Sequence, residues 1–246
     1  MYKGLLTGIC LTLSLTVFAS PESICGEEDD RAPSFNHKVG RLAVEGQHKG
    51  CTVTMISDDC AISAGHCLPV LEIAEFNTPA SIGGKPQPSK LEDVYMIDKD
   101  SIVLEDKGPG KDWAVLKIKR NHLTGKLPGE VQGHYDVSFQ TPAKGSMLRI
   151  TGYGADSPDD ERHFAQQTHT GKFRGLAAWY GKAAFKHTVD TMGGSSGSSI
   201  LDENTGEIIG IHTHGGCRTN GGANMGTMIS KHKKLKAAIK ACLNRK

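Results

Sequence analysis

Residues 61–67 read Ala-Ile-Ser-Ala-Gly-His-Cys, and this stretch contains the most informative pattern in the chain. A short β-like run of apolar and small residues ends at His66, which stands next to a cysteine. A single histidine more often has a structural role than a catalytic one. The stretch therefore gains meaning only together with other segments that carry reactive side chains.

Two further segments complete the pattern. In residues 111–118, Asp112 stands at the start of an apolar strand, where a carboxylate can be buried and oriented. Residues 193–200 read Gly-Gly-Ser-Ser-Gly-Ser-Ser-Ile. Glycines around a serine let the backbone turn tightly and expose two N–H groups near the hydroxyl. The chain thus presents a histidine, an aspartate and a serine, in that order, as candidates for nucleophilic catalysis.

The rest of the chain predicts an all-β domain. Short runs with period-two alternation or apolar cores are separated by Gly, Pro and Asp, which is typical of barrels and sandwiches. The clearest runs are 52–56, 61–63, 80–82, 113–118, 147–151, 186–189, 208–213 and 225–229. Residues 119–144 contain few strand signals, so we expect them to connect two halves.

A helix is predicted at the C-terminus, over residues 230–243. Its apolar face consists of Leu235, Ala238, Ile239, Cys242 and Leu243 at helical spacing. Residues 231–246 contain seven Lys or Arg and no acidic residue. Such a charge run usually forms a solvated face, and contact with an anionic surface is the alternative.

Composition excludes several classes of protein. The 246 residues are 37% hydrophobic and 23% charged, which is enough apolar material for a core. A formal net charge of only +2 argues against a dedicated nucleic-acid binder. No apolar run reaches about 18 residues, so no membrane span is expected. No spacing of acidic residues predicts calcium, and no metal or other cofactor is predicted.

The first residues indicate export. Lys3 precedes an apolar stretch from Leu5 to Ala19 that suits a signal peptide, residues 1–19, cleaved before Ser20. Removal leaves six cysteines, and an even number in an exported chain indicates disulfides. We therefore expect a protein secreted to the outside or to a periplasm. Residues 20–37 form an N-terminal segment that includes a short propeptide.

Together the three segments resemble those of chymotrypsin-like serine proteases, which show Ala-Gly-His-Cys, an Asp at the head of an apolar strand, and Gly-x-Ser-Gly. The resemblance covers residues 39–243. It implies two six-stranded antiparallel Greek-key β-barrels packed together, followed by a C-terminal helix. The implied protease domain is 38–243, with barrels at about 38–120 and 145–229. Protein or peptide substrates and a monomer are implied as well.

A narrower resemblance is to bacterial glutamyl endopeptidases. Residues 24–31 look like the mature N-terminal motif of that subfamily, and residues 51–67, 150–153, 189–191 and 211–215 follow it too. Ser199 departs from the usual Pro. The resemblance implies a disulfide between Cys51 and Cys67. The other four cysteines, Cys25, Cys60, Cys217 and Cys242, allow three pairings that the sequence does not distinguish.

The resemblance also assigns catalytic roles. Ser196 is the nucleophile, His66 the general base, and Asp112 the buried anion that holds the imidazole tautomer. The backbone N–H groups of Gly194 and Ser196 form the oxyanion hole. These roles suit the chemistry, because a neutral hydroxyl needs a base whose pKa lies near the working pH.

Two features compete over the substrate preference. His212 and Thr191 match the residues that glutamyl endopeptidases place around an acidic side chain, whereas Asp190 matches an acid that selects Arg or Lys in trypsin-like relatives. We favour Glu. Thr213 to Gly215 would offer backbone groups to an extended substrate strand. His212 and His214 share a strand face, but they lack a third ligand and so make a poor zinc site.

Two other functions remain open at the level of sequence. Residues 193–197 also fit the Gly-x-Ser-x-Gly elbow of α/β-hydrolases, with Ser195 as nucleophile of an esterase. That fold needs its acid and histidine after the serine and a helix-rich body. A binding protein on an inactive protease fold is the second alternative.

Overall fold

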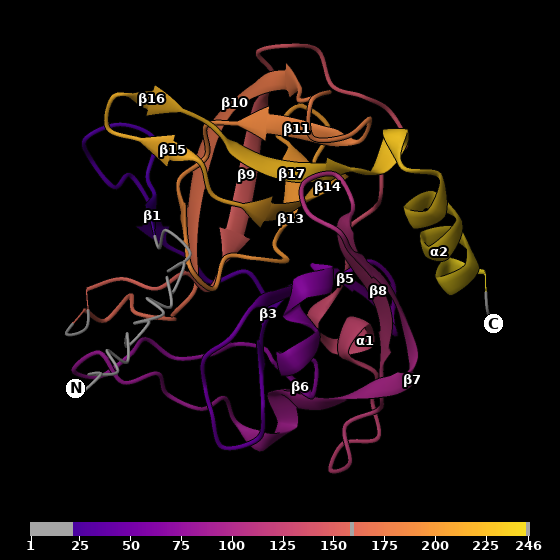
Figure 1. Ribbon diagram of the computed structural model, residues 1–246. Coiled ribbons are helices and arrows are strands. Elements are labelled where there is room, and N and C mark those ends of the chain that lie inside the picture. The colour runs from indigo at the N-terminus through magenta and orange to yellow at the C-terminus, as the bar shows by residue number, and fades with distance from the viewer. Residues whose placement is uncertain (1–21, 158–159, 245–246) are drawn as a thin grey trace, which may run out of the picture.

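The computed structural model describes residues 22–157 and 160–244, and their strands form two closed barrels (Figure 1). The predicted signal peptide, residues 1–19, lies outside the described residues. In the first barrel the strands are hydrogen-bonded in the order β3-β4-β5-β8-β7-β6. They are β3 (Val39–Ala43), β4 (Thr52–Met55), β5 (Cys60–Ser63), β6 (Ile73–Glu75), β7 (Val94–Asp106) and β8 (Asp112–Ile118).

The second barrel follows the order β11-β17-β14-β13-β9-β10, and a further pairing of β10 with β11 closes it. Its strands are β9 (Met147–Gly152), β10 (Gln167–Leu176), β11 (Ala184–His187), β13 (Ser199–Asp202), β14 (Ile208–His214) and β17 (Asn224–Met228). A short strand, β2 (Ala32–Pro33), is added at the edge of β10. The predicted architecture of two six-stranded antiparallel barrels is confirmed.

Small elements surround the barrels. Two short strand pairs lie beside the second barrel: β1 (Glu22–Ser23) with β12 (Thr191–Met192), and β15 (Cys217–Arg218) with β16 (Gly221–Gly222). The connection between the barrels contains α1 (Pro128–Gln132). The 3₁₀ turns are η1 (Gly65–Val70), η2 (Leu91–Asp93) and η3 (Ile229–Lys231). The last element is α2 (Lys233–Leu243), so the C-terminal helix begins three residues later than predicted, after η3.

Three buried apolar clusters hold these parts together. One fills the first barrel and includes Leu42, Val53 and Leu116, and another fills the second barrel. The third cluster joins residues of both barrels to Leu235 and Ile239 of α2. The helix α2 forms because its apolar face packs against both barrels, although its exposed face is strongly basic.

Two local predictions are wrong. Residues 80–82 form no strand, and only an isolated bridge joins Ile82 to Lys85. Leu243 is 39% exposed rather than part of the buried face of α2.

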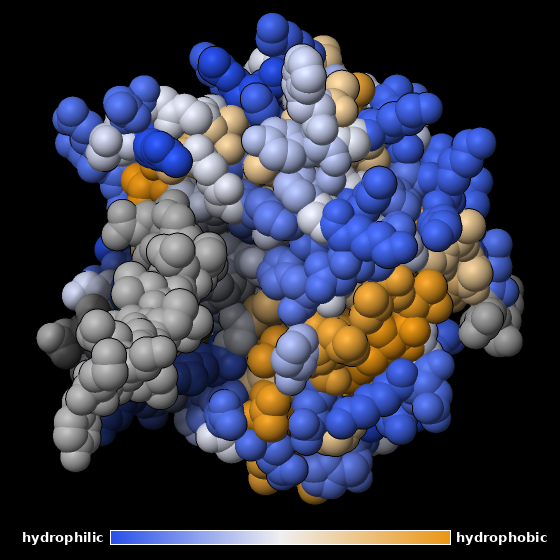
Figure 2. Space-filling model, in the orientation of Figure 1, coloured by the Kyte–Doolittle hydropathy of each residue, from blue (hydrophilic) through white to orange (hydrophobic). Residues whose placement is uncertain are grey.

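Figure 2 shows an apolar area below α2 and over the strands of the first barrel, a region where Val103 and Leu104 of β7 border the helix. Among the described residues, no helix is long and apolar enough to cross a membrane.

Three disulfides connect distant parts of the chain. Cys51 is bonded to Cys67, as the resemblance implied. The other two bonds join Cys25 to Cys217 and Cys60 to Cys242. The first of these fixes the N-terminal segment to β15, and the second fixes α2 to the first barrel.

Candidate active site

His66 and Asp112 form the centre of the site. Asp112 is fully buried at the first position of β8, and its Oδ2 lies 2.6 Å from His66 Nδ1. Its other oxygen accepts hydrogen bonds from the backbone N–H groups of Gly65, at 2.6 Å, and His66, at 3.2 Å. Because Nδ1–H donates to this fixed carboxylate, the lone pair of neutral His66 is at Nε2, where a general base needs it.

Gly65 makes this approach possible. A Cβ on Gly65 would lie 2.2 Å from the backbone oxygen of Glu105, so the turn after β5 could not pack against β7 with a larger residue there. The small residues before His66 therefore have a steric purpose, which is to bring the histidine close to β8.

The pKa of His66 is raised above its ordinary value. Burial lowers the pKa, but the hydrogen bond and the negative charge of Asp112 together outweigh burial. His214 lies beside this pair, with its ring centroid 6.0 Å from that of His66. Burial lowers the pKa of His214, so it is a neutral neighbour near neutral pH.

The two adjacent serines have opposite environments. Ser195 is buried, and its Oγ accepts a hydrogen bond from the backbone N–H of Met192 at 3.3 Å. Ser196 is partly exposed. Within the described chain no hydrogen bond joins Ser196 Oγ to His66, and such bonds often shorten only when substrate is bound. Ser196 is thus the more exposed of the two serines.

The backbone around Ser196 offers free donors. The N–H groups of Gly194 and Ser196 donate to no other residue in the part of the chain that the structure describes. Gly194 has φ of 102°, and a Cβ there would lie 2.3 Å from the backbone oxygen of Tyr153. A glycine is therefore required at this position. Two unpaired N–H groups on one tight turn can receive a developing oxyanion.

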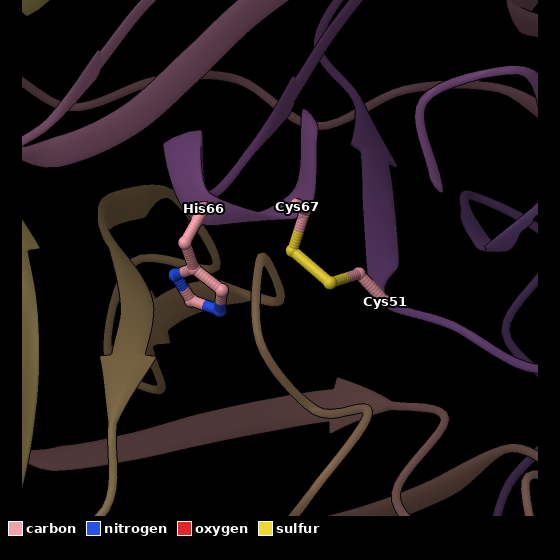
Figure 3. A group of neighbouring side chains, drawn as sticks. All are labelled: Cys51, His66 and Cys67. Atoms are coloured by element: carbon pink, nitrogen blue, oxygen red, sulfur yellow. A yellow bond between two sulfur atoms is a disulfide. The ribbon is translucent and has the colours of Figure 1, made fainter. Parts of the chain in front are cut away.

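The disulfide Cys51–Cys67 lies beside His66. Figure 3 shows the His66 ring and the sulfur–sulfur bond next to each other below the turn η1. The three side chains are close enough together to resemble a metal site, but both sulfurs are in the disulfide and are unavailable as thiolate ligands. The bond instead fixes η1, and with it His66, to the start of β4.

His212 is buried in the second barrel, close to His187. The distance from His187 Nε2 to His212 Nδ1 is 3.3 Å. The backbone N–H of Val189 donates to His187 Nδ1 at 3.2 Å, so neutral His187 carries its proton at Nε2 and donates it to His212. Neutral His212 must then carry its own proton at Nε2. The chain of bonds selects the tautomer of His212.

Both histidines are neutral in this fold. Burial lowers the pKa of His187 to about 3. Burial, together with the repulsion that a charge on His187, His214 or His66 would add, lowers the pKa of His212 well below its ordinary value. Burial therefore makes His212 an uncharged N–H donor in the absence of an anion.

Asn224 connects the segments around Thr191. Its amide nitrogen donates to the backbone oxygens of Ser23, at 2.7 Å, and Val189, at 2.8 Å, and lies 3.2 Å from Thr191 Oγ1. Its oxygen accepts from the N–H groups of residues 216 and 217. Asn224 is fully buried. One side chain therefore links β1, the Thr191 strand and the segment after β14.

The side chain of Asp190 is hydrogen-bonded to the backbone of the N-terminal segment. Its carboxylate accepts hydrogen bonds from the backbone N–H groups of Cys25, at 2.7 Å, and Asp30, at 3.2 Å, and its side chain is 1% exposed. Asp30, His169 and Asp190 also lie close enough together to hold a cation. However, His169 Nδ1 already accepts the Asp190 N–H at 2.8 Å, so this nitrogen is not free for a metal.

The segment after His212 borders the catalytic pair. Thr213 Oγ1 lies 2.8 Å from His214 Nδ1, and His214 Nδ1 lies 3.9 Å from Asp112 Oδ2. Gly215 is exposed, and its backbone groups bond to no other described residue. An extended peptide could pair with this free edge.

Sequence reasoning missed two residues at the site, His187 and Asn224. His187 lies in the predicted strand 186–189. The only feature of the sequence that could have identified it is a histidine at a strand position that faces the barrel interior. Asn224 has no local signal, because its hydrogen-bond partners lie in three separate segments, 23–25, 189–191 and 216–217. Both were found from their hydrogen bonds alone.

Comparisons with known proteins bear on the family and the fold of the chain. A family model described as Trypsin matches residues 24–238. No curated protein sequence matches the chain significantly. A solved structure described as a Glu endopeptidase in complex with MPD superposes with a TM-score of 0.66 at 18% identity, covering 89% of this chain and 99% of that one.

Two further solved structures share the fold. The thermostable serine protease AL20 from an extremophilic microorganism has a TM-score of 0.63 and 13% identity, with 86% of this chain and 99% of that chain covered. The protease Anisep from Arthrobacter nicotinovorans has a TM-score of 0.61 and 17% identity, with 84% and 99% covered.

Proposed function

The chain belongs to the trypsin family of serine-type peptidases, and on this premise we propose that it is an endopeptidase with Ser196 as nucleophile, His66 as general base and Asp112 as the residue that orients His66. The carboxylate of Asp112, 2.6 Å from His66 Nδ1, supports this assignment more than any other contact. Ser196 is partly exposed and Ser195 is buried, which favours a protease with Ser196 as nucleophile over an esterase with Ser195 as nucleophile.

The steps follow from these positions. His66 Nε2 takes the proton of Ser196 as Oγ attacks the peptide carbonyl carbon. The N–H groups of Gly194 and Ser196 bind the resulting oxyanion, and Asp112 stabilises the imidazolium. His66 then gives its proton to the leaving amine. The amine departs, and the acyl group stays bonded to Ser196 Oγ as an acyl-enzyme. Water, activated by the same base, hydrolyses the acyl-enzyme and frees Ser196.

We further propose that the residue before the scissile bond is Glu or, less well, Asp. One observation favours this over Arg or Lys: the carboxylate of Asp190 is buried and accepts two backbone N–H groups of the N-terminal segment. A substrate cation would have to displace those bonds. Thr191 Oγ1 and the Nε2–H of His212 are instead donors suited to a carboxylate. A bound carboxylate would also raise the pKa of His212.

The N-terminal segment contributes to this pocket. Ser23 pairs with Thr191 across β1 and β12. If the secreted protein cuts itself after Glu22, the new α-amine of Ser23 would be largely protonated at pH 7 and would lie next to Thr191. A cation at this point would stabilise the acidic side chain. We therefore propose a secreted monomer that is activated by removal of residues 20–22.

A peptide panel tests the proposal. Peptides that differ only in the residue before the scissile bond (Glu, Asp, Gln, Arg or Lys) should be cleaved with the highest kcat/KM at Glu. Asp190→Asn, which keeps an oxygen acceptor, should retain this order. Preferred cleavage after Arg or Lys that is lost in Asp190→Asn would overturn the acidic preference and leave the triad intact.

A further inference from the structure

A hollow of about 570 Å³ lies next to the free peptide edge. Gly215 and Gly216 form one side of it, directly after β14, which contains His212. The strands β17, β11 and β10 lie next to one another beyond that edge (Figure 1). A peptide that pairs with Gly215 and continues past Gly216 would therefore pass this hollow.

Three cations line the hollow without partners. Arg174 comes from β10, Lys186 from β11 and Arg218 from β15. All three are exposed, and none forms an ion pair with a carboxylate among the described residues. No lining residue of the hollow is acidic. Arg149 on β9 of the same barrel is, by contrast, paired with Glu203 at 2.8 Å.

The strand register places two of these cations close together. Lys186 is opposite Gly175, so it is next to Arg174 on the neighbouring strand, across a bulge. Like charges at such positions are destabilising by themselves. On the other side, Lys186 is opposite Met225, which is opposite His214. Lys186 is thus two strands from β14, roughly 10 Å at the usual strand spacing, and it lines the same hollow as Gly215 and Gly216.

We propose that Arg174, Lys186 and Arg218 form a secondary binding site for acidic side chains located two to four residues before the scissile bond. This inference rests on the proposed endopeptidase function. The residue in the pocket at His212 is the one whose carbonyl Ser196 attacks. The residues that precede it are the ones that can pair along 214–216, the continuation of the same strand. The preferred substrates are therefore peptide segments in which acidic residues are clustered.

The expected effect is moderate. An exposed ion pair contributes little, so each acidic residue should raise kcat/KM by about 2–5-fold, and two together by about 4–25-fold. Because the pairs are exposed, the gain should decrease at high ionic strength.

The test uses peptides with Glu before the scissile bond and Ala, Glu or Lys at the third and fourth positions before it. Wild type should favour Glu over Ala at these positions. The triple variant Arg174→Gln, Lys186→Gln, Arg218→Gln should lose that preference and cleave the Ala peptide as wild type does. A control triple variant with the same change in charge, Lys172→Gln, Lys182→Gln, Lys233→Gln, should keep it. Lys186→Glu should shift the preference toward Lys.

Three results would overturn the proposal. They are an unchanged preference in the Arg174/Lys186/Arg218 variant, an equal loss in the control variant, and a preference for acids only after the scissile bond. Failure of the proposed function looks different. In that case the Ala peptide itself would not be cleaved, or would be cleaved equally well with Gln in place of Glu before the bond.

Discussion

Ser195 and Ser196 are neighbours in sequence, but Ser196 is the more exposed of the two. We expect Ser196→Ala to abolish peptide hydrolysis and labelling by a serine-directed phosphonate, because it removes the proposed nucleophile. Ser195→Ala should keep substantial activity, since among the described residues the Ser195 hydroxyl bonds only to the Met192 N–H. Kinetics and mass spectrometry of labelled protein measure both. Labelling that disappears only in Ser195→Ala would instead identify Ser195 as the nucleophile, as the esterase alternative requires.

The raised pKa of His66 sets the expected pH dependence. The base must be neutral, so kcat/KM should fall about tenfold per pH unit below a pKa that lies above the ordinary value of about 6.5. Asp112→Asn removes the charge that raises this pKa, so the acid limb should move to lower pH. Turnover should fall by roughly 10⁴ because the wrong tautomer is presented. A flat profile between pH 5 and 8 would contradict the role of His66.

His187 is expected to act on specificity through His212. In His187→Leu, His212 Nδ1 loses its donor, so the tautomer with Nε2–H is no longer selected. The ratio of kcat/KM for Glu over Gln peptides should fall about 5–10-fold, on the order of one hydrogen bond. His187→Gln keeps one acceptor for Val189 N–H and one donor, and should restore much of the ratio. An unchanged ratio in His187→Leu would show that the pair is only structural.

Among the elements, the two-residue strand β1 has the most direct connection to function. It is held by its pairing with β12, by the bond from Asn224 to Ser23, and by the disulfide Cys25–Cys217 just after it. These contacts hold Ser23 next to Thr191 whether or not the chain has been cut before it.

We therefore expect N-terminal sequencing of the active protein to give Ser23. Glu22→Gln should block self-cleavage, leave Ser20 at the terminus, and reduce the preference for Glu by about tenfold, the effect of one charged hydrogen bond. Glu28→Gln, an exposed glutamate of the same segment, should be processed normally. A Glu22→Gln protein with the same terminus and preference as wild type would refute this maturation.

Across the whole molecule, the contact between α2 and the barrels is strengthened by Cys60–Cys242, which spans 182 residues. The double variant Cys60→Ala, Cys242→Ala should lower the free energy of unfolding by about 2–4 kcal/mol in denaturant titrations. Leu243→Ala, on the exposed side of the same helix, should change it by less than about 0.5 kcal/mol. Activity at 25 °C should remain near wild type, because α2 is not part of the site. A double variant as stable as wild type would contradict this.

The order of residues predicted an all-β domain, and its resemblance to a known family added the two-barrel architecture and the candidate triad. Alternating apolar runs identify strands because burial on one face of a sheet repeats every second residue. The segments around His66, Asp112 and Ser196 are recognisable because each depends on local chemistry: small residues for close approach, an acid at a strand start, and glycines at a tight turn. Such requirements act over a few neighbouring residues, so they are visible in the order of residues.

Only the tertiary structure decided what the distant residues do. The pairing of Cys25 with Cys217, the burial of Asp190 beneath the N-terminal segment, and the bond from His187 to His212 each join parts of the chain far apart in sequence. The unpaired cations Arg174, Lys186 and Arg218 come together from three strands. Barrel closure and strand register set these neighbours, and no short stretch of sequence encodes which strand will lie beside it.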